Sequence, residues 1–439
     1  MRGFYHIYPQ FSAKGLFLFS GTIVCLLCFP QIQDFLIEIG ERIKGRPLNH
    51  SHWRKNIPLK AIKIFVRGYI LIFLFLCAKR FFTILQKERR CQNFFEEQAK
   101  RDFLFDNFKG ILIFLVVFGH FIENFQSVSN HESIRIVWQF IYVFHMPAFA
   151  FVSGFFAKPN DEKIFEKVLE KQIIPLIVFQ ILYEAFFMLI FGGIPGAFLD
   201  FRPFGILWYL LSLACWRISF QLFARIKGVL VFSLLAALYV GRIESINGTL
   251  SLSRTIVLFP FFIAGYFFKE KNLIEKIVKR KNIFLIFLLA AVLVVALIYV
   301  WKMLLPNSLF TNDCSYRAFG LNFKKGIAFR FLTLSLAFLC SISIMTITPQ
   351  KKCFLSEIGR NSIMPYLSHM FFLYGMKFHF FNFYNNLVFT FLGGIAVSAA
   401  IVYFFGKDIV SKIFNDDMKK ISRRVLKRAS LSLSGLTRQ

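Results

Sequence analysis

Long runs of apolar residues recur along almost the whole chain, and they constrain its fold more than any other feature. A run of about 20 apolar residues is long enough to cross a bilayer as one α-helix. Such runs fall at about 15–30, 61–78, 108–125, 137–157, 172–193, 204–222, 228–241, 255–268, 283–301, 327–349, 361–378 and 385–406. The sequence therefore predicts an all-α, polytopic integral membrane protein in the lipid bilayer, with a core bundle of about ten transmembrane helices.

The last ten runs follow one another with short connections, and they define the predicted membrane domain at 101–410. We expect an N-terminal extension at 1–100 with one or two membrane-associated hydrophobic helices, and a basic cytoplasmic tail at 411–439. The run at 61–78 contains Lys63 and Arg67, so a spanning helix and an interfacial helix both stay open for it.

The formal net charge is +29, from 53 Lys and Arg against 24 Asp and Glu. These cations concentrate in alternate loops: 158–171 carries four lysines, whereas 194–203 carries only Arg202. Loop 302–326, assigned outside, departs from the pattern with four cations. By the positive-inside rule, the alternation places both ends of the ten-helix core in the cytoplasm. No aromatic-basic module accompanies the charge, so we expect no nucleic-acid partner.

One span carries two ionisable residues far from any loop. On one helix, His120 lies ~16 Å beyond Lys109, which predicts an imidazole near the middle of the bilayer. Glu123 follows at i+3 on the same face and can orient that imidazole. A buried histidine in a helical bundle is often only structural. Ionisable side chains inside a membrane are costly, however, and so mark functional sites by default.

Other polar residues interrupt the later runs, and each has a structural interpretation beside a functional one. A histidine before Pro147 indicates either a kink or a second site histidine. A tryptophan at the start of a span is typical of an interfacial belt, and an arginine there either snorkels to the interface or binds an anion or a sugar. The residues concerned are His145, Ser153, Trp208, Arg254, Asn361, Tyr366 and His369.

Taken together, these segments resemble the membrane-bound acyltransferase 3 family, most closely its fucose 4-O-acetylase-like and exopolysaccharide O-acetyltransferase branch. The motifs occur in the family's order over roughly 101–406. They are Asp106-Asn107-Phe108-Lys109-Gly110 with His120 and Glu123, Phe144-His145-Met146-Pro147 with Ser153-Gly154-Phe155, Leu207-Trp208-Tyr209, Ser253-Arg254-Thr255 with Gly265-Tyr266, and Gly359-Arg360-Asn361-Ser362 with Tyr366 and His369.

The resemblance implies an acetyl-CoA-dependent O-acetyltransferase of the bacterial plasma (inner) membrane, acting on a hydroxyl of a cell-surface sugar or polysaccharide. Acyl-CoA is then the cosubstrate, and no metal is expected. His120 and Glu123 would be catalytic, with His120 either a general base or an acyl carrier. A proton-coupled exporter of a polysaccharide or lipid-linked sugar stays open as the alternative. Substrate-binding residues would be Lys109, Arg101, Asp106, Asn107, His145, Ser153, Trp208, Arg254, Asn361, Tyr366 and His369.

Overall fold

The computed structural model describes residues 103–126, 132–191, 202–246, 249–278, 311–379 and 387–436. The chain divides into two compact units, 1–99 and 100–439, and all described residues belong to the second. Predictions about the N-terminal extension, and about Arg101, therefore lie outside the described residues. Within the described ranges every regular element is a helix, in agreement with the predicted all-α class.

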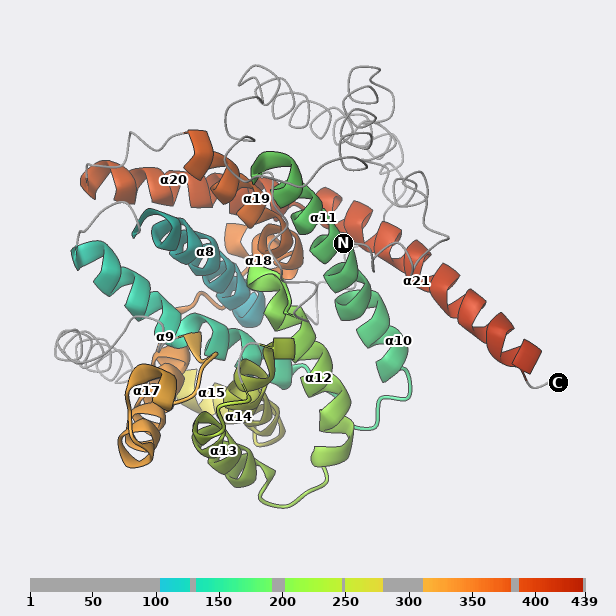
Figure 1. Ribbon diagram of the computed structural model, residues 1–439, viewed down its shortest axis with the longest axis horizontal. Helices are drawn as coiled ribbons and strands as arrows, with labels where there is room; N and C mark the ends of the chain where they lie inside the picture. Colours follow the sequence, from blue (N-terminus) through green and yellow to red (C-terminus); the bar gives the residue numbers. More distant parts are fainter. Residues whose placement is uncertain are drawn as a thin grey trace, which may run out of the picture. The chain divides into compact units, whose positions relative to one another are not determined.

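The helices follow one another with short connections where the structure describes them (Figure 1). The longer ones are α8 (Phe103–Gln126), α9 (Glu132–Phe155), α11 (Ile174–Phe191), α12 (Trp208–Phe223), α13 (Val229–Tyr239), α14 (Leu252–Glu270), α17 (Phe323–Ile347), α19 (Ile363–His379), α20 (Leu387–Phe405) and α21 (Asp408–Leu436). The shorter ones are α10 (Ile164–Val168), the π-helix η2 (Leu169–Ile173), α15 (Leu273–Val278), α18 (Phe354–Arg360) and the 3₁₀ turns η3 (Gly205–Leu207), η4 (Val240–Arg242), η5 (Thr249–Ser251) and η7 (Arg317–Phe319).

Six of these helical segments are long and apolar enough to cross a membrane, and the bent pair α20–α21 would make a seventh. Helix α13, with η4, is shorter, and α19 has 17 residues. The predicted span at 283–301 lies outside the described residues. The described residues thus contain several helices that are able to span a membrane, whereas the count of ten stays a prediction.

Helix α8 is the central helix of the described part. It packs against α9, α18, α19 and α20 (Figure 1). The apolar window of α8 is 72% buried, whereas that of the segment 164–190 is only 28% buried. A helix that other helices surround can hold polar side chains away from lipid. Helix α8 is therefore well placed to hold the polar side chains of a functional site.

Close helix crossings at glycine hold this arrangement together. A Cβ at Gly359 in α18 would collide with the backbone carbonyl of Asp106 in α8. At the crossing of α9 and α14, a Cβ at Gly154 would collide with the backbone of Phe262, and one at Gly265 with the backbone of Phe151. Small residues let helix backbones approach in this way inside membranes.

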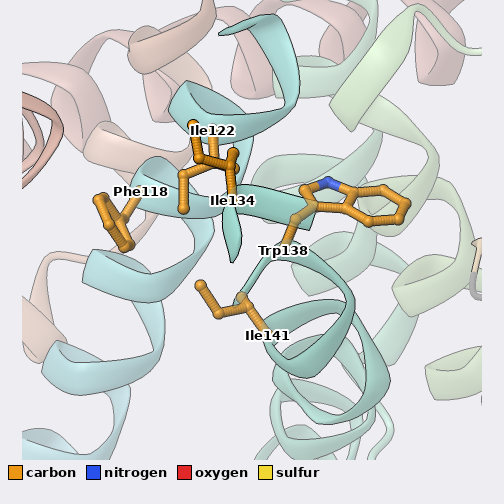
Figure 2. Close-up of a cluster of buried hydrophobic side chains, with 5 residues drawn as sticks. All are labelled: Phe118, Ile122, Ile134, Trp138 and Ile141. Atoms are coloured by element: carbon orange, nitrogen blue, oxygen red, sulfur yellow. The ribbon is translucent and has the colours of Figure 1, made fainter. Parts of the chain in front are cut away.

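A cluster of buried apolar side chains fixes how α8 and α9 lie against each other. Figure 2 shows Phe118 and Ile122 of α8 beside Ile134, Trp138 and Ile141 of α9. Tyr142 packs against this cluster from α9 and is only partly buried itself. Because the side chains interlock, the register between the two helices is set just where α8 carries His120.

The structure places the first core span a few residues earlier than the apolar run suggested. The predicted span began at about 108, but the helical span begins at Phe103 and ends at Asn124. His120 is therefore about 25 Å from Phe103 and only about 6 Å from Asn124 along the axis. Lys109 and His120 therefore lie on one helix, as expected, and the placement of Lys109 at the membrane surface with His120 near the bilayer middle stays a prediction.

The C-terminal segment predicted as a basic tail begins as a packed helix. Helix α21 starts at Asp408 and leaves the direction of α20 by 58°. Ser411, Met418 and Ser422 are buried, and Lys419 and Lys420 are exposed on the other side. The helix therefore has one face on the bundle and one basic face.

Candidate active site

Three polar side chains from α8 and α9 meet near the C-terminal end of α8. The Nδ1 atom of His120 lies 2.8 Å from Oε2 of Glu123 and 2.9 Å from the hydroxyl oxygen of Tyr142. The Tyr142 hydroxyl donates to the same Glu123 oxygen at 2.6 Å. His120 and Glu123 are one helical turn apart, whereas Tyr142 comes from the facing helix. The three groups thus form a closed triangle of hydrogen bonds.

This triangle fixes the tautomer of His120. The Tyr142 proton is used on Glu123, so Nδ1 of His120 carries the hydrogen that points at the carboxylate and at the phenol oxygen. In the neutral imidazole the other ring nitrogen, Nε2, has a free lone pair, and the contacts of the ring to described residues involve Nδ1. An imidazole held in this way by a carboxylate can act as a general base or as a nucleophile.

Two more histidines border this triangle, from different helices. The ring of His369 in α19 lies 5.3 Å from the ring of His120, and the ring of His145 in α9 lies 4.9 Å from that of Tyr142. Both histidines are buried. We call His120, Glu123, Tyr142, His145 and His369 the histidine site. The structure therefore brings together the three site histidines that the sequence predicted.

Arg254, at the start of α14, lies beside this site. Its guanidinium donates to the carbonyl oxygen of Thr311 at 2.9 Å and to Oδ2 of Asp313 at 2.7 Å. It also lies over the ring of Trp208, 4.9 Å from the centroid. Its charge acts on Glu123 in the histidine site. The arginine predicted to snorkel or to bind an anion is thus held by a carboxylate and an indole near the histidines.

A series of polar and aromatic side chains leads away from His369. The ring of Tyr366, one turn earlier in α19, lies 6.3 Å from that of His369 and 6.1 Å from that of Tyr209 in α12. The Tyr209 hydroxyl is 2.9 Å from Oγ of Ser153, near the end of α9. Tyr366 itself donates to the carbonyl oxygen of Ile206. The series joins Ser153 and Tyr366, which the sequence predicted separately.

Two lysines face aromatic rings at the C-terminal end of α9. The Lys109 Nζ atom lies 5.9 Å from the ring centroid of Phe156, and the Lys269 Nζ atom lies 5.8 Å from that of Phe155. Lys109 also forms an ion pair with Asp106 at 2.9 Å. We call Lys109, Lys269, Phe155 and Phe156 the lysine cluster. It places two cations one turn beyond Ser153, at the other end of the series.

Asn107 has no hydrogen-bonding capacity left for a substrate. Its Nδ2 donates to the carbonyl oxygens of Pro349 at 2.7 Å and of Lys351 at 2.8 Å. Its Oδ1 accepts from Cys353 Sγ at 3.2 Å and from Ser356 Oγ at 2.6 Å. All four of its hydrogen-bonding positions are therefore occupied by the chain. Asn107 joins α8 to the segment that leads into α18.

Asn361 has a similar structural task at the start of α19. Its Nδ2 donates to the carbonyl oxygen of Gly406 at 2.9 Å and to Oδ1 of Asp408 at 2.6 Å. Arg360 donates to the other oxygen of that carboxylate at 2.7 Å. These contacts fasten the bend between α20 and α21, and the structure places Asn361 apart from the histidine site.

Sequence reasoning missed Tyr142, Tyr209, Lys269 and Asp313. Tyr142 had a signal, because it precedes His145 by less than one turn and so lies on the same side of α9. Tyr209 stood in the Leu207-Trp208-Tyr209 motif, whereas Lys269 and Asp313 had no signal, since their partners lie 59 or more residues away along the chain. In the part of the chain that the structure describes, no three His, Cys, Asp or Glu side chains are grouped as metal ligands would be.

Comparisons with known proteins identify the family of this chain. The chain is 30% identical over 186 residues to the nodulation protein NolL of Sinorhizobium fredii, which covers 39% of this chain and 49% of that protein. The chain thus spans about half the length of this curated relative. No solved structure matches the chain. Residues 104–406, which contain the histidine site and the lysine cluster, match the acyltransferase domain family. The chain therefore belongs to the membrane-bound acyltransferase 3 family.

Proposed function

We propose that this protein is an O-acyltransferase that moves an acetyl (acyl) group from acyl-CoA to a hydroxyl of a cell-surface sugar or polysaccharide. The observation that carries this proposal is the closed triangle of His120, Glu123 and Tyr142 within an acyltransferase domain. It leaves one unprotonated imidazole nitrogen, which is the group that acyl transfer to a hydroxyl requires.

The transfer follows from that nitrogen. Nε2 of His120 takes the proton of the acceptor hydroxyl while the hydroxyl oxygen attacks the thioester carbonyl carbon. The new C–O bond forms, the C–S bond breaks, and the thiolate leaves and receives the proton back from His120. Glu123 and Tyr142 hold the ring in place, and the carboxylate stabilises the imidazolium that forms in between.

The same nitrogen supports a second route, in which His120 carries the acyl group. Nε2 then attacks the thioester carbonyl first, the C–S bond breaks, and the thiolate leaves an acyl-imidazolium on His120. In a second step the acceptor hydroxyl attacks the acyl carbon, the C–N bond breaks and returns its electron pair to Nε2, and the hydroxyl proton passes to the thiolate. Acyl-histidine trapped in denatured protein after incubation with labelled acyl-CoA alone supports this relay. Obligatory ternary-complex kinetics without trapped label support direct transfer.

The lysine cluster supports a cytoplasmic donor site. Lys109 and Lys269 converge on Phe155 and Phe156, and paired cations beside aromatic rings suit the phosphates and adenine of a CoA ester. Lys109 precedes His120 by ~16 Å along α8. An extended pantetheine arm reaches over such a distance. By the positive-inside rule, this end of the bundle lies on the cytoplasmic side of a bacterial plasma membrane.

Arg254, Asp313 and Trp208 support an acceptor site on the other side of the histidines. An indole ring with an arginine–carboxylate pair offers a stacking surface and several hydrogen-bonding positions, as a sugar needs. Glu123 is 45% exposed at its side chain, against 19% for His120, so the triangle is accessible from the Glu123 side.

The decisive experiment follows the chemistry of the product. Membranes containing the full chain receive labelled acetyl-CoA, and the label is sought in alkali-labile ester on the surface glycan. The proposal expects ester in the wild type and in Arg317→Gln, which breaks only an exposed pair with Glu244. It expects none in His120→Ala. Movement of glycan across the membrane without any new ester would favour the exporter instead.

A further inference from the structure

His369 carries a hydrogen-bond acceptor for which the described residues provide no donor. Its ring is fully buried, and its Nδ1 lies 3.0 Å from the carbonyl oxygen of Pro365. Two acceptors do not approach so closely, so Nδ1 carries the hydrogen and donates it to that carbonyl. Nε2 is then a lone-pair acceptor, and it has no partner in the part of the chain that the structure describes.

An unpaired buried acceptor is unusual and costly. Such an atom loses its hydrogen bonds to water without gaining others, and buried polar side chains in folded proteins nearly always have partners. The Ser398 hydroxyl in α20 is also buried without a partner among the described residues. The ring of His369 lies 5.3 Å from that of His120. Its missing donor therefore belongs to something bound at the histidine site.

The neighbours of His369 indicate which substrate brings that donor. On one side lies His120, where the acyl group is transferred under the proposed function. On the other side, Tyr366 and Tyr209 lead to Ser153, one turn before the lysine cluster. His369 thus stands between the proposed phosphate-binding lysines and the proposed base, along the course of the pantetheine arm.

We propose that Nε2 of His369 accepts a hydrogen bond from the amide N–H of acyl-CoA that is nearest to the sulfur. This inference rests on the proposed function. In acyl-CoA, only a short ethylene link separates that amide from the sulfur, so fixing the amide fixes the thioester carbonyl opposite His120. His369 then binds the acyl-CoA substrate, and its Nδ1 keeps the hydrogen throughout the transfer.

Two small thioesters test this contact in the purified full-length protein, reconstituted in lipid nanodiscs. One is the acetyl thioester of N-acetylcysteamine, which has the amide N–H. The other is the acetyl thioester of 2-mercaptoethyl acetate, in which an ester oxygen replaces that N–H. Each variant is measured with both compounds and the same glycan acceptor. The ratio of the two kcat/KM values is the readout, because partial misfolding of a variant leaves a ratio unchanged.

We expect the wild type to prefer the amide thioester by about tenfold, the worth of one hydrogen bond. His369→Leu removes the acceptor and should bring the ratio close to one. His369→Gln places a carbonyl oxygen near the position of Nε2 and should restore part of the preference. The matched control is Ser398→Ala, which removes another buried polar atom without a partner and should keep the wild-type ratio.

Two outcomes overturn the inference without touching the proposed function. In the first, the wild type transfers acetyl from acetyl-CoA but shows no preference between the small thioesters. In the second, His369→Leu leaves the thioester ratio unchanged. If that variant also loses selection between an acceptor with neighbouring hydroxyls and its deoxy analogue, His369 contacts the acceptor instead. Absence of any transfer from acetyl-CoA in the wild type would instead remove the proposed function itself.

Discussion

The two ends of helix α8 carry polar side chains of similar kinds, but they use them differently. Near its start, Asn107 fills all four hydrogen-bonding positions with partners from the chain, and Lys109 is paired with Asp106. Near its end, His120 fills only Nδ1 and leaves Nε2 free, beside the unpaired Nε2 of His369. A saturated polar group holds the fold together, whereas an unsaturated one is available to a substrate.

After the loss of His120 itself, Glu123→Gln should have the largest effect on activity at the end of α8. The amide removes the charge that stabilises an imidazolium, and its NH₂ group can donate to Nδ1 and so place the ring proton on Nε2. Acyl transfer should fall by about 10²–10⁴-fold. The rate is measured with labelled acetyl-CoA, with Glu244→Gln as an exposed control. Wild-type rates in Glu123→Gln would show that the triangle is not part of the reaction.

Asn107→Ala should have the largest effect on stability at the start of α8. It leaves the carbonyl oxygens of Pro349 and Lys351 without their donors, and we expect a loss of about 2–4 kcal/mol. Thermal unfolding in detergent measures this loss. The fraction that stays folded should transfer acetyl at the wild-type rate. A stable Asn107→Ala protein with low activity would break the contrast between the two ends.

Tyr142→Phe should weaken the triangle without removing it. The variant loses the donor to Glu123 and one partner of Nδ1 in His120, while the ring keeps its packing against Trp138. One hydrogen bond corresponds to about a tenfold loss of rate. The KM for acyl-CoA should stay unchanged, since the tyrosine lies away from the lysine cluster. A change in KM alone would move Tyr142 from orienting the base to binding the donor.

The smallest expected effect lies in the connection between α9 and α10. Lys167 donates to both carboxyl oxygens of Asp161, and this contact lowers the pKa of Asp161 below its usual value. A carboxyl group with a lowered pKa contributes stability above its unfolded pKa and loses it as the pH falls through the folded value. Asp161→Asn should therefore flatten the acid side of the stability profile as the pH falls below the ordinary pKa of an aspartate, about 4. Parallel profiles for the two proteins would contradict this assignment.

The sequence predicted the helices well where apolar runs were long, but it misplaced the start of α8. Charged Asp106 and Lys109 look like loop residues in a hydropathy profile. The structure pairs them one turn apart, so both lie inside the helix at little cost.

The local half of the histidine site was predictable, and the rest was not. His120 and Glu123 are three residues apart, and that spacing alone places them on one helix face. Tyr142 and His369 join them only through the packing of α8 against α9 and α19. Such register between helices depends on how side chains interlock, as Phe118 and Ile141 do, and no spacing along the chain reveals it.

The most direct test of the central claim compares His120→Ala with Asn107→Ala in one preparation, measuring both the unfolding temperature and the rate of acetyl transfer to glycan. The account predicts opposite results: His120→Ala keeps its unfolding temperature and loses transfer, and Asn107→Ala loses unfolding temperature and keeps transfer per folded molecule. A His120→Ala protein that transfers acetyl at the wild-type rate would contradict the account.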